Sequence, residues 1–239
     1  MSRENILNKI RAKLGPENKV SRGSQFVGAR INDHPSNLIP KRATRSGENQ
    51  DQLIDLFITE AETATASVAC VARMQDVPGA VAAYLKHHNL PTSIRTVPHA
   101  DVADMPWQAE TLLDVDSGPA VGGDEVGVGR AFGGVAETGT LVMVSGADTP
   151  TMVNVLPRNN IVVVRRSEIA ATYEDVWAKL RVATGSMPGA TRLPRSVNWI
   201  TGPSRTADIE QTLLLGAHGP QRLHIVIVED GDRDDGGAG

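Results

Sequence analysis

Cysteine is almost missing from this chain of 239 residues, which has a single one, Cys70. One thiol cannot close an intramolecular disulfide, and it cannot hold an iron–sulfur cluster, which takes about four ligands, mostly cysteine thiolates. Cys70 stands in an apolar run, residues 68–72, so we expect it to be buried and to serve in packing. We therefore expect no cluster. The absence of HExxH and CxxC spacings likewise predicts no metal, and we expect no other cofactor.

Long apolar runs and an excess of positive charge are missing too. No stretch of about 18 or more apolar residues occurs, which predicts that the chain does not span a membrane. The N-terminus, residues 1–5, leads into charged sequence without a secretory signal, so we expect a cytoplasmic protein. The net charge of −4 and the sequence pI of about 5.9 give no bulk attraction for nucleic acid.

Aromatic residues make up only 3 % of the chain, so the core must be built from Val, Ile, Leu and Ala. Such a core suits a parallel sheet covered by helices. The expected helices are 2–14, 49–66, 78–88, 150–156, 172–183 and 206–215, and the expected strands are 68–71, 93–97, 140–144, 161–164, 197–200 and 223–228. Strands that alternate with helices predict an α/β fold with a mostly parallel sheet flanked by helices.

The composition also predicts how the chain is organised. Residues 1–48 hold the N-terminal helix and a long polar connection rich in Gly, Pro, Asn, Ser and Arg. Residues 49–229 are expected to form a single α/β domain. Residues 230–239 form an Asp- and Gly-rich tail, which we expect to be disordered.

The first segment that could carry chemistry is 133–140, where Glu137 stands among small residues just before an expected strand. Glycines such as Gly139 let the backbone approach a ligand closely, and Thr138 and Thr140 can donate hydrogen bonds. Glu137 is a candidate catalytic base or nucleophile, or an acceptor for a substrate hydroxyl. The alternative is an ordinary turn in which Glu137 is solvated or bonded to backbone amides.

Glycines just ahead of this segment do not form a nucleotide-binding fingerprint. Gly127 and Gly129 have the G-x-G spacing, but Phe132 stands where the third glycine is required. The run also precedes a strand instead of following one. We therefore exclude a dinucleotide site here.

The second segment is 200–210, where a strand is expected to end, a Gly-Pro turn follows and a helix is expected to begin. Backbone amides at that helix start, with Ser204, Arg205 and Thr206, could bind an anion. Asp208 in the first turn already satisfies the helix dipole, which favours a small carboxylate ligand over a phosphate. The alternative is ordinary helix capping by Thr206.

We expect these two segments to converge on one pocket at one end of the sheet, because parallel βαβ winding brings strand ends to the same edge. In that pocket Arg205 would hold a carboxylate, and Glu137 would face the hydroxyl or the reacting carbon of the ligand. His218, in the run 216–220, is a candidate acid–base or binding group; the alternative is a structural or exposed side chain.

Four strings of sequence together, at 133–140, 156–164, 201–210 and 216–220, resemble the lactate utilisation protein C family. The resemblance implies a fold like that of ribose-5-phosphate isomerase and the CoA transferases, with an N-terminal helical extension. It also implies a place in a three-protein system that oxidises L-lactate to pyruvate for use as a carbon source, with iron–sulfur sister proteins as partners.

Two functions fit this resemblance. The first is a non-redox accessory subunit that binds its sister proteins or a small carboxylate substrate. The second is a stand-alone enzyme, similar to the CoA transferases and sugar-phosphate isomerases, which acts on a small carboxylate or phosphorylated ligand through Glu137.

Overall fold

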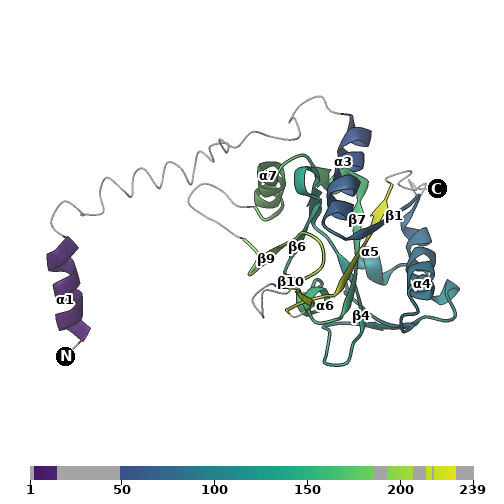
Figure 1. Cartoon of the computed structure of the whole chain (residues 1–239), viewed down its shortest axis with the longest axis horizontal. Helices are drawn as coiled ribbons and strands as arrows, with labels where there is room; N and C mark the ends of the chain where they lie inside the picture. Colours follow the sequence, from purple (N-terminus) through teal and green to yellow (C-terminus); the bar gives the residue numbers. More distant parts are fainter. Residues whose placement is uncertain (1–2, 15–48, 186–192, 207–213, 217, 230–239) are drawn as a thin grey trace, which may run out of the picture.

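Two sheets with their covering helices make up most of what the computed structural model describes, which is residues 3–14, 49–185, 193–206, 214–216 and 218–229 (Figure 1). The larger sheet has six strands in the order β1-β12-β7-β4-β2-β3, and every neighbouring pair is parallel. These strands are β1 (Ser67–Val71), β12 (Arg222–Val228), β7 (Asn159–Arg165), β4 (Val126–Arg130), β2 (Ser93–Thr96) and β3 (Asp114–Ser117). The predicted α/β fold with a mostly parallel sheet is confirmed.

Helices and short turns pack on one face of this sheet. They are η2 (Met74–Asp76), α4 (Val77–His87), α5 (Ala100–Ala103) and η3 (Trp107–Ala109). Val81 and Leu85 of α4 and Val102 of α5 belong to the same buried cluster as alternate residues of β4, β7 and β12. Central strands that are apolar on both faces are what a doubly covered parallel sheet requires.

The opposite face is covered by α3 (Gln50–Thr63) and by a second sheet of four strands in the order β8-β5-β6-β9. This second sheet is made of β8 (Ile169–Ala170), β5 (Gly133–Val135), β6 (Thr140–Val144) and β9 (Val197–Ile200), with η4 (Ala136–Thr138) between β5 and β6 and η5 (Arg166–Glu168) before β8. Phe57 of α3 is fully buried among Leu141, Val162 and Ile225. Helix α7 (Tyr173–Ala183) packs on β5 and β8.

The glycines at 127 and 129 have a packing role in β4. Helix α6 (Met152–Val155) crosses β4 so closely that a Cβ on Gly127 would lie 2.4 Å from the carbonyl oxygen of Val153. A Cβ on Gly129 would lie 2.4 Å from Oδ1 of Asn154. The spacing of these glycines therefore follows from the approach of α6.

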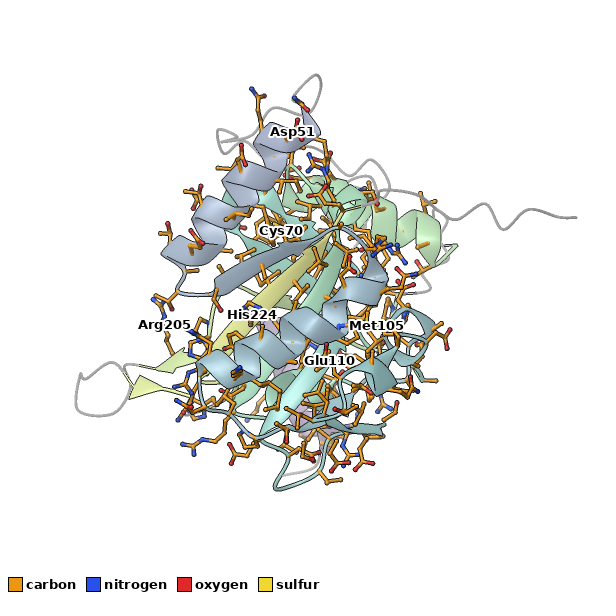
Figure 2. All side chains as sticks on the ribbon, turned by 90° about the vertical axis from the view of Figure 1, so that its right-hand side faces the viewer. Asp51, Cys70, Met105, Glu110, Arg205 and His224 are labelled. Atoms are coloured by element: carbon orange, nitrogen blue, oxygen red, sulfur yellow. The ribbon has the colours of Figure 1, made fainter. Side chains whose placement is uncertain are left out.

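Two predictions from the sequence are wrong. Cys70 is exposed, because β1 pairs with β12 alone among the described strands and so forms an edge of the sheet (Figure 2). The segment 206–215 was expected to be a helix. Its two described ends instead pair with each other as antiparallel strands, β10 (Arg205–Thr206) with β11 (Leu214–Leu215). The amide of Gly216 donates to the carbonyl of Ser204 and extends this pairing.

Other expectations fall partly or wholly outside the described residues. The N-terminal helix, α1 (Arg3–Leu14), stands apart from the two sheets in Figure 1. The polar connection 15–48 and the tail 230–239 lie outside the described part. None of the helices within it has the length and apolar character that crossing a membrane requires.

A buried histidine predicts how stability depends on pH. His224 lies in β12 (Figure 2). Its ring is stacked on that of Tyr84 in α4 with ring centroids 4.0 Å apart, and its Nδ1 lies 2.8 Å from the Ser67 hydroxyl. Burial, assisted by the charge of His88, lowers the pKa of His224 from 6.5 to about 4. The unfolded chain therefore takes up a proton at a higher pH than the folded chain does.

We expect stability to be complete above pH 6.5 and to fall between pH 6.5 and 4, by as much as about 3 kcal/mol. Urea unfolding at a series of pH values measures this change. His224→Gln should flatten the curve in that window, whereas the matched change at the exposed His87 should not. A wild-type curve that is flat between pH 6.5 and 4 would contradict the assignment.

Candidate functional site

The larger sheet has a point where the chain leaves two neighbouring strands in opposite directions. After β2 it turns to α5, whose Val102 packs on the α4 face. After β4, which lies next to β2, it enters β5 on the other face, where Ala131 joins the cluster under α3. In open α/β sheets, ligands bind in the crevice at the carboxyl ends of strands at such a switch point. The structure therefore points to the space between the ends of β2 and β4.

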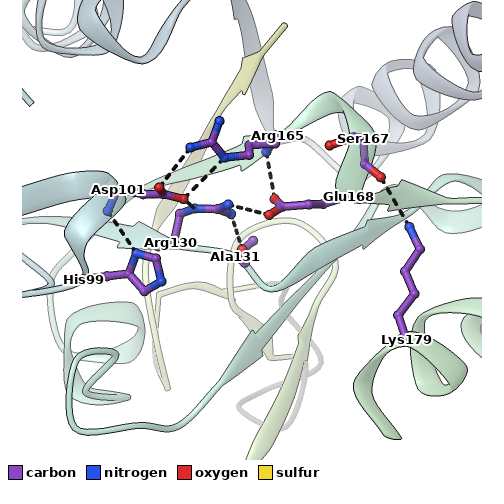
Figure 3. A network of polar contacts seen from close by, with 8 residues as sticks. All are labelled: His99, Asp101, Arg130, Ala131, Arg165, Ser167, Glu168 and Lys179. Carbon is purple, nitrogen blue, oxygen red and sulfur yellow. Dashed lines mark hydrogen bonds and ion pairs between the residues drawn. The ribbon is translucent and has the colours of Figure 1, made fainter. Parts of the chain in front are cut away.

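Arg130, the last residue of β4, lies in this space (Figure 3). Its side chain is only 5 % exposed, and it lies between two carboxylates. Nε donates to Asp101 at 2.9 Å, Nη2 donates to Glu168 at 2.5 Å, and Nη1 donates to the carbonyl of Ala131. The guanidinium therefore joins the first turn of α5 to η5, which follows β7, across the switch point.

Asp101 accepts hydrogen bonds from a second arginine as well. Arg165, the last residue of β7, donates to it through Nη2 at 2.9 Å, while the Arg165 amide donates to Glu168 at 3.0 Å (Figure 3). Burial acts to raise the pKa of Asp101, but the hydrogen bonds and charges of Arg165 and Arg130 outweigh it and hold the pKa below the usual 3.8. The four charged side chains thus form a network with no net charge.

His99 stands directly before α5 and acts as its N-cap. Its Nδ1 accepts a hydrogen bond from the amide of Asp101 at 3.2 Å (Figure 3). Because an accepting Nδ1 carries no proton, the neutral ring must carry its proton on Nε2. Nε2 has no hydrogen-bond partner among the described residues, and His99 lines the cleft described next.

Around this network lies a cleft of about 560 Å³. It is lined by His99, Asp101, Arg130, Ala131, Phe132, Val144, Asp148, Thr149, Ser167, Glu168, Lys179 and Ala183. Lys179 is exposed on α7, and its Nζ donates to the carbonyl of Ser167 at 3.3 Å. The volume falls within the range of roughly 300–1,000 Å³ that is usual for ligand sites. No group of three or more metal-ligating side chains occurs in the part of the chain that the structure describes.

The structure places the residues around Glu137 in a different part of the second sheet. Glu137 is half-buried, and its carboxylate accepts the amide of Tyr173 at the start of α7, 3.4 Å away. The hydroxyls of Thr138 and Thr140 lie 2.7 Å apart, and each lies 3.1 Å from the Tyr173 hydroxyl. Thr140 also lies 2.7 Å from the hydroxyl of Thr201. The two predicted segments therefore meet at Thr140 and Thr201.

Gly139 and Arg205 both lie against the end of α3. Gly139 has a left-handed φ of +60°, and a Cβ there would lie 2.2 Å from the backbone nitrogen of Ala61. Arg205 donates from Nη2 to the carbonyl of Ala64 at 2.7 Å and to the hydroxyl of Thr65 (Figure 2). The described side-chain hydrogen bonds of Arg205 are thus with the C-terminus of α3.

The other predicted site residues that the structure describes do not line the cleft, although Ser204 lies beside the run 216–220. The amide of Ser204 donates to the carbonyl of Pro220, and Thr206 stands in β10 instead of at a helix start. His218 is exposed in the turn before β12. Asp208 lies outside the described residues. The anion site was predicted at the first turn of a helix that begins at Thr206. Because Thr206 lies in a strand, that helix start is not present at this residue.

The sequence did contain a signal for the cleft that was missed. Both β4 and β7 are apolar runs that end in arginine, Arg130 and Arg165. A charged residue at the carboxyl end of a buried strand is a candidate for the ligand edge of the sheet. Asp101 lies 29 residues before Arg130, and no local pattern connects the two.

Comparison with known proteins identifies the segment that carries most of this cleft. A family model described as the LUD domain matches residues 123–228. The chain is 36 % identical over 106 residues to lactate utilization protein C of Halalkalibacterium halodurans, a match that covers 44 % of this chain and 45 % of that protein. It is 33 % identical over 109 residues to lactate utilization protein C of Bacillus subtilis, covering 45 % and 44 %. The match thus spans less than half the length of these relatives.

A solved structure supports the fold. The crystal structure of a DUF162 family protein from Deinococcus radiodurans aligns with a TM-score of 0.55 and 20 % identity. The alignment covers 76 % of this chain and 99 % of that one. Since the identity is low, this likeness supports the architecture alone.

Proposed function

With a LUD-domain match over residues 123–228 as the premise, we propose that this protein takes part in lactate utilisation as a ligand-binding, non-redox component. One observation carries the proposal. All residues that line the cleft, except His99 and Asp101, belong to the segment 123–228 that matches the LUD domain. The cleft is therefore the functional site that we propose for the matched domain.

The proposed division of labour follows from the cysteine content. Oxidation of L-lactate to pyruvate releases two electrons, which need a redox cofactor to accept them. A chain whose only cysteine is Cys70 cannot supply the thiolates of a cluster. We propose that iron–sulfur partner proteins in the cytoplasm carry the electrons, and that this chain binds the substrate, the product or those partners.

Deletion of the gene tests this role. We expect growth on L-lactate as sole carbon source to be abolished or slowed, while growth on pyruvate stays normal, because pyruvate enters metabolism after the proposed step. The wild-type gene supplied on a plasmid should restore growth on L-lactate. Equal growth defects on both carbon sources, or none on either, would show that the proposal is wrong.

The alternative function is that of an enzyme that uses Glu137 in catalysis. One substitution distinguishes this enzyme from the ligand-binding, non-redox component. The Glu137→Gln change keeps the shape of the side chain and its acceptor for the Tyr173 amide, while it removes the charge. We expect the variant to support growth on L-lactate and to keep its melting temperature, since Glu137 is bonded to backbone. Loss of growth at an unchanged melting temperature would favour the enzyme.

A further inference from the structure

We propose that Arg130 and His99 form a carboxylate subsite in the cleft, and that its ligand is a small 2-hydroxy or 2-oxo acid. The choice of acids rests on the proposed function, whereas the position and chemistry of the subsite rest on the contacts of these two residues. The subsite is distinct from the residues predicted from sequence, because both side chains lie at the switch point between β2 and β4.

Arg130 provides the positive charge. Of the five N–H groups of a guanidinium, three donate to Asp101, Glu168 and the carbonyl of Ala131. The other two have no partner among the described residues, although the side chain is only 5 % exposed and forms part of the cleft wall. A buried donor without an acceptor is unfavourable, and a ligand oxygen would satisfy it. One of these N–H groups is on Nη1 and the other on Nη2, and an arginine guanidinium readily donates such groups to a carboxylate.

His99 adds a third donor from the other side of the switch point. Its Nδ1 is committed to the cap of α5, so Nε2–H is the ring donor that remains for a ligand. Arg130 and His99 thus offer three N–H groups in one cleft. A 2-hydroxy or 2-oxo acid has three oxygens on adjacent carbons, which matches these donors in number.

The charges around the subsite favour a monoanion over a phosphate. Asp101 and Glu168 already neutralise Arg130 and Arg165. A carboxylate brings one further negative charge close to these two acidic side chains, while a phosphate group brings about 1.5 to 2. Repulsion therefore disfavours the phosphate more strongly than the carboxylate.

Calorimetric titration of the full chain with L-lactate and with pyruvate tests the subsite. Lactamide, in which a neutral amide replaces the carboxylate, and inorganic phosphate serve as the comparison ligands. We expect both acids to bind, and both comparison ligands to bind at least about tenfold more weakly, because charge-assisted hydrogen bonds are lost or repulsion is added.

His99→Ser is the diagnostic variant. Serine is a good N-cap, so the cap of α5 and the melting temperature should be kept. The short side chain cannot reach the position of Nε2. We expect roughly ten- to hundredfold weaker binding of the acids, and His87→Ser, the same change at an exposed histidine of α4, should leave binding unaltered.

Three results would overturn the subsite: no binding of either acid by the wild-type chain, equal or tighter binding of lactamide or phosphate, or unchanged binding by His99→Ser. Failure of the subsite and failure of the proposed function can be told apart. Acid binding without a growth defect in the deletion strain would refute the role in lactate utilisation. A growth defect without acid binding would refute the subsite alone.

Discussion

Gly139→Ala should destabilise the protein by roughly 2–5 kcal/mol, a large part of the stability of an ordinary domain. The residue has a left-handed φ of +60°, which costs a non-glycine residue about 1 kcal/mol or more. The new Cβ would also lie 2.2 Å from the nitrogen and 2.6 Å from the Cα of Ala61. These are backbone atoms of α3, so the helix itself would have to move away from the core. Urea unfolding followed by circular dichroism measures the loss.

Gly185→Ala separates the two causes of this effect. Gly185 has nearly the same φ, +62°, but no described atom lies within 4 Å of the Cβ that it would gain. We expect this variant to lose only about 1 kcal/mol, the contribution of the backbone conformation. Equal losses for the two variants would mean that the contact with α3 does not matter.

Arg130→Met should cost about 3–5 kcal/mol, the usual penalty for removing one partner from a buried charge network. Methionine fills much of the same volume, but Glu168 loses its guanidinium partner and Asp101 keeps only Arg165. Both carboxylates would stay partly buried with an unbalanced negative charge. The free energy of unfolding at neutral pH is the quantity to measure.

An exposed arginine provides the matched control, and pH checks the cause. Arg73 pairs with Asp76 at the surface, with the side chains 65 % and 36 % exposed, so Arg73→Met should change stability by less than about 1 kcal/mol. Because Asp101 has a lowered pKa, its stabilising contribution is present above pH 3.8 and is lost as the pH falls further. The gap between Arg130→Met and wild type should therefore narrow in acid; a constant gap would point to lost packing.

Much of the fold could be predicted, because its elements carry local signals. The β7 strand is a run of buried branched residues, and α7 begins with a capping box in which Thr172 and Asp175 bond to each other. Such signals involve residues within a few positions of one another. A strand was likewise expected at 93–97, and β2 occupies Ser93–Thr96.

Failures of prediction have non-local causes. The β4 strand has two glycines in five residues, which local propensity disfavours, and only the approach of α6 accounts for them. The helix expected at 206–215 had good local capping, but the described ends of that segment pair as β10 and β11. Cys70 was expected to be buried because its neighbours are apolar, and only the strand order places it on an edge.

The candidate site was harder to predict than the fold. Glu137, Thr138 and Thr140 attracted attention because small and polar residues cluster there, and the structure joins them to Tyr173 and Thr201. The cleft instead depends on the opposite directions in which the chain leaves β2 and β4. That property belongs to the topology of the whole sheet, and single residues do not reveal it.

The direct passage of the chain from one sheet to the other has a consequence for cooperativity. Only two residues separate β4 from β5, and only η5 separates β7 from β8. Helix α3 contacts β1 of the larger sheet and β8 of the smaller one. Neither sheet can lose its structure without exposing apolar side chains of the other. Heat or urea should therefore unfold both in one all-or-none transition, with circular dichroism and tryptophan fluorescence changing together.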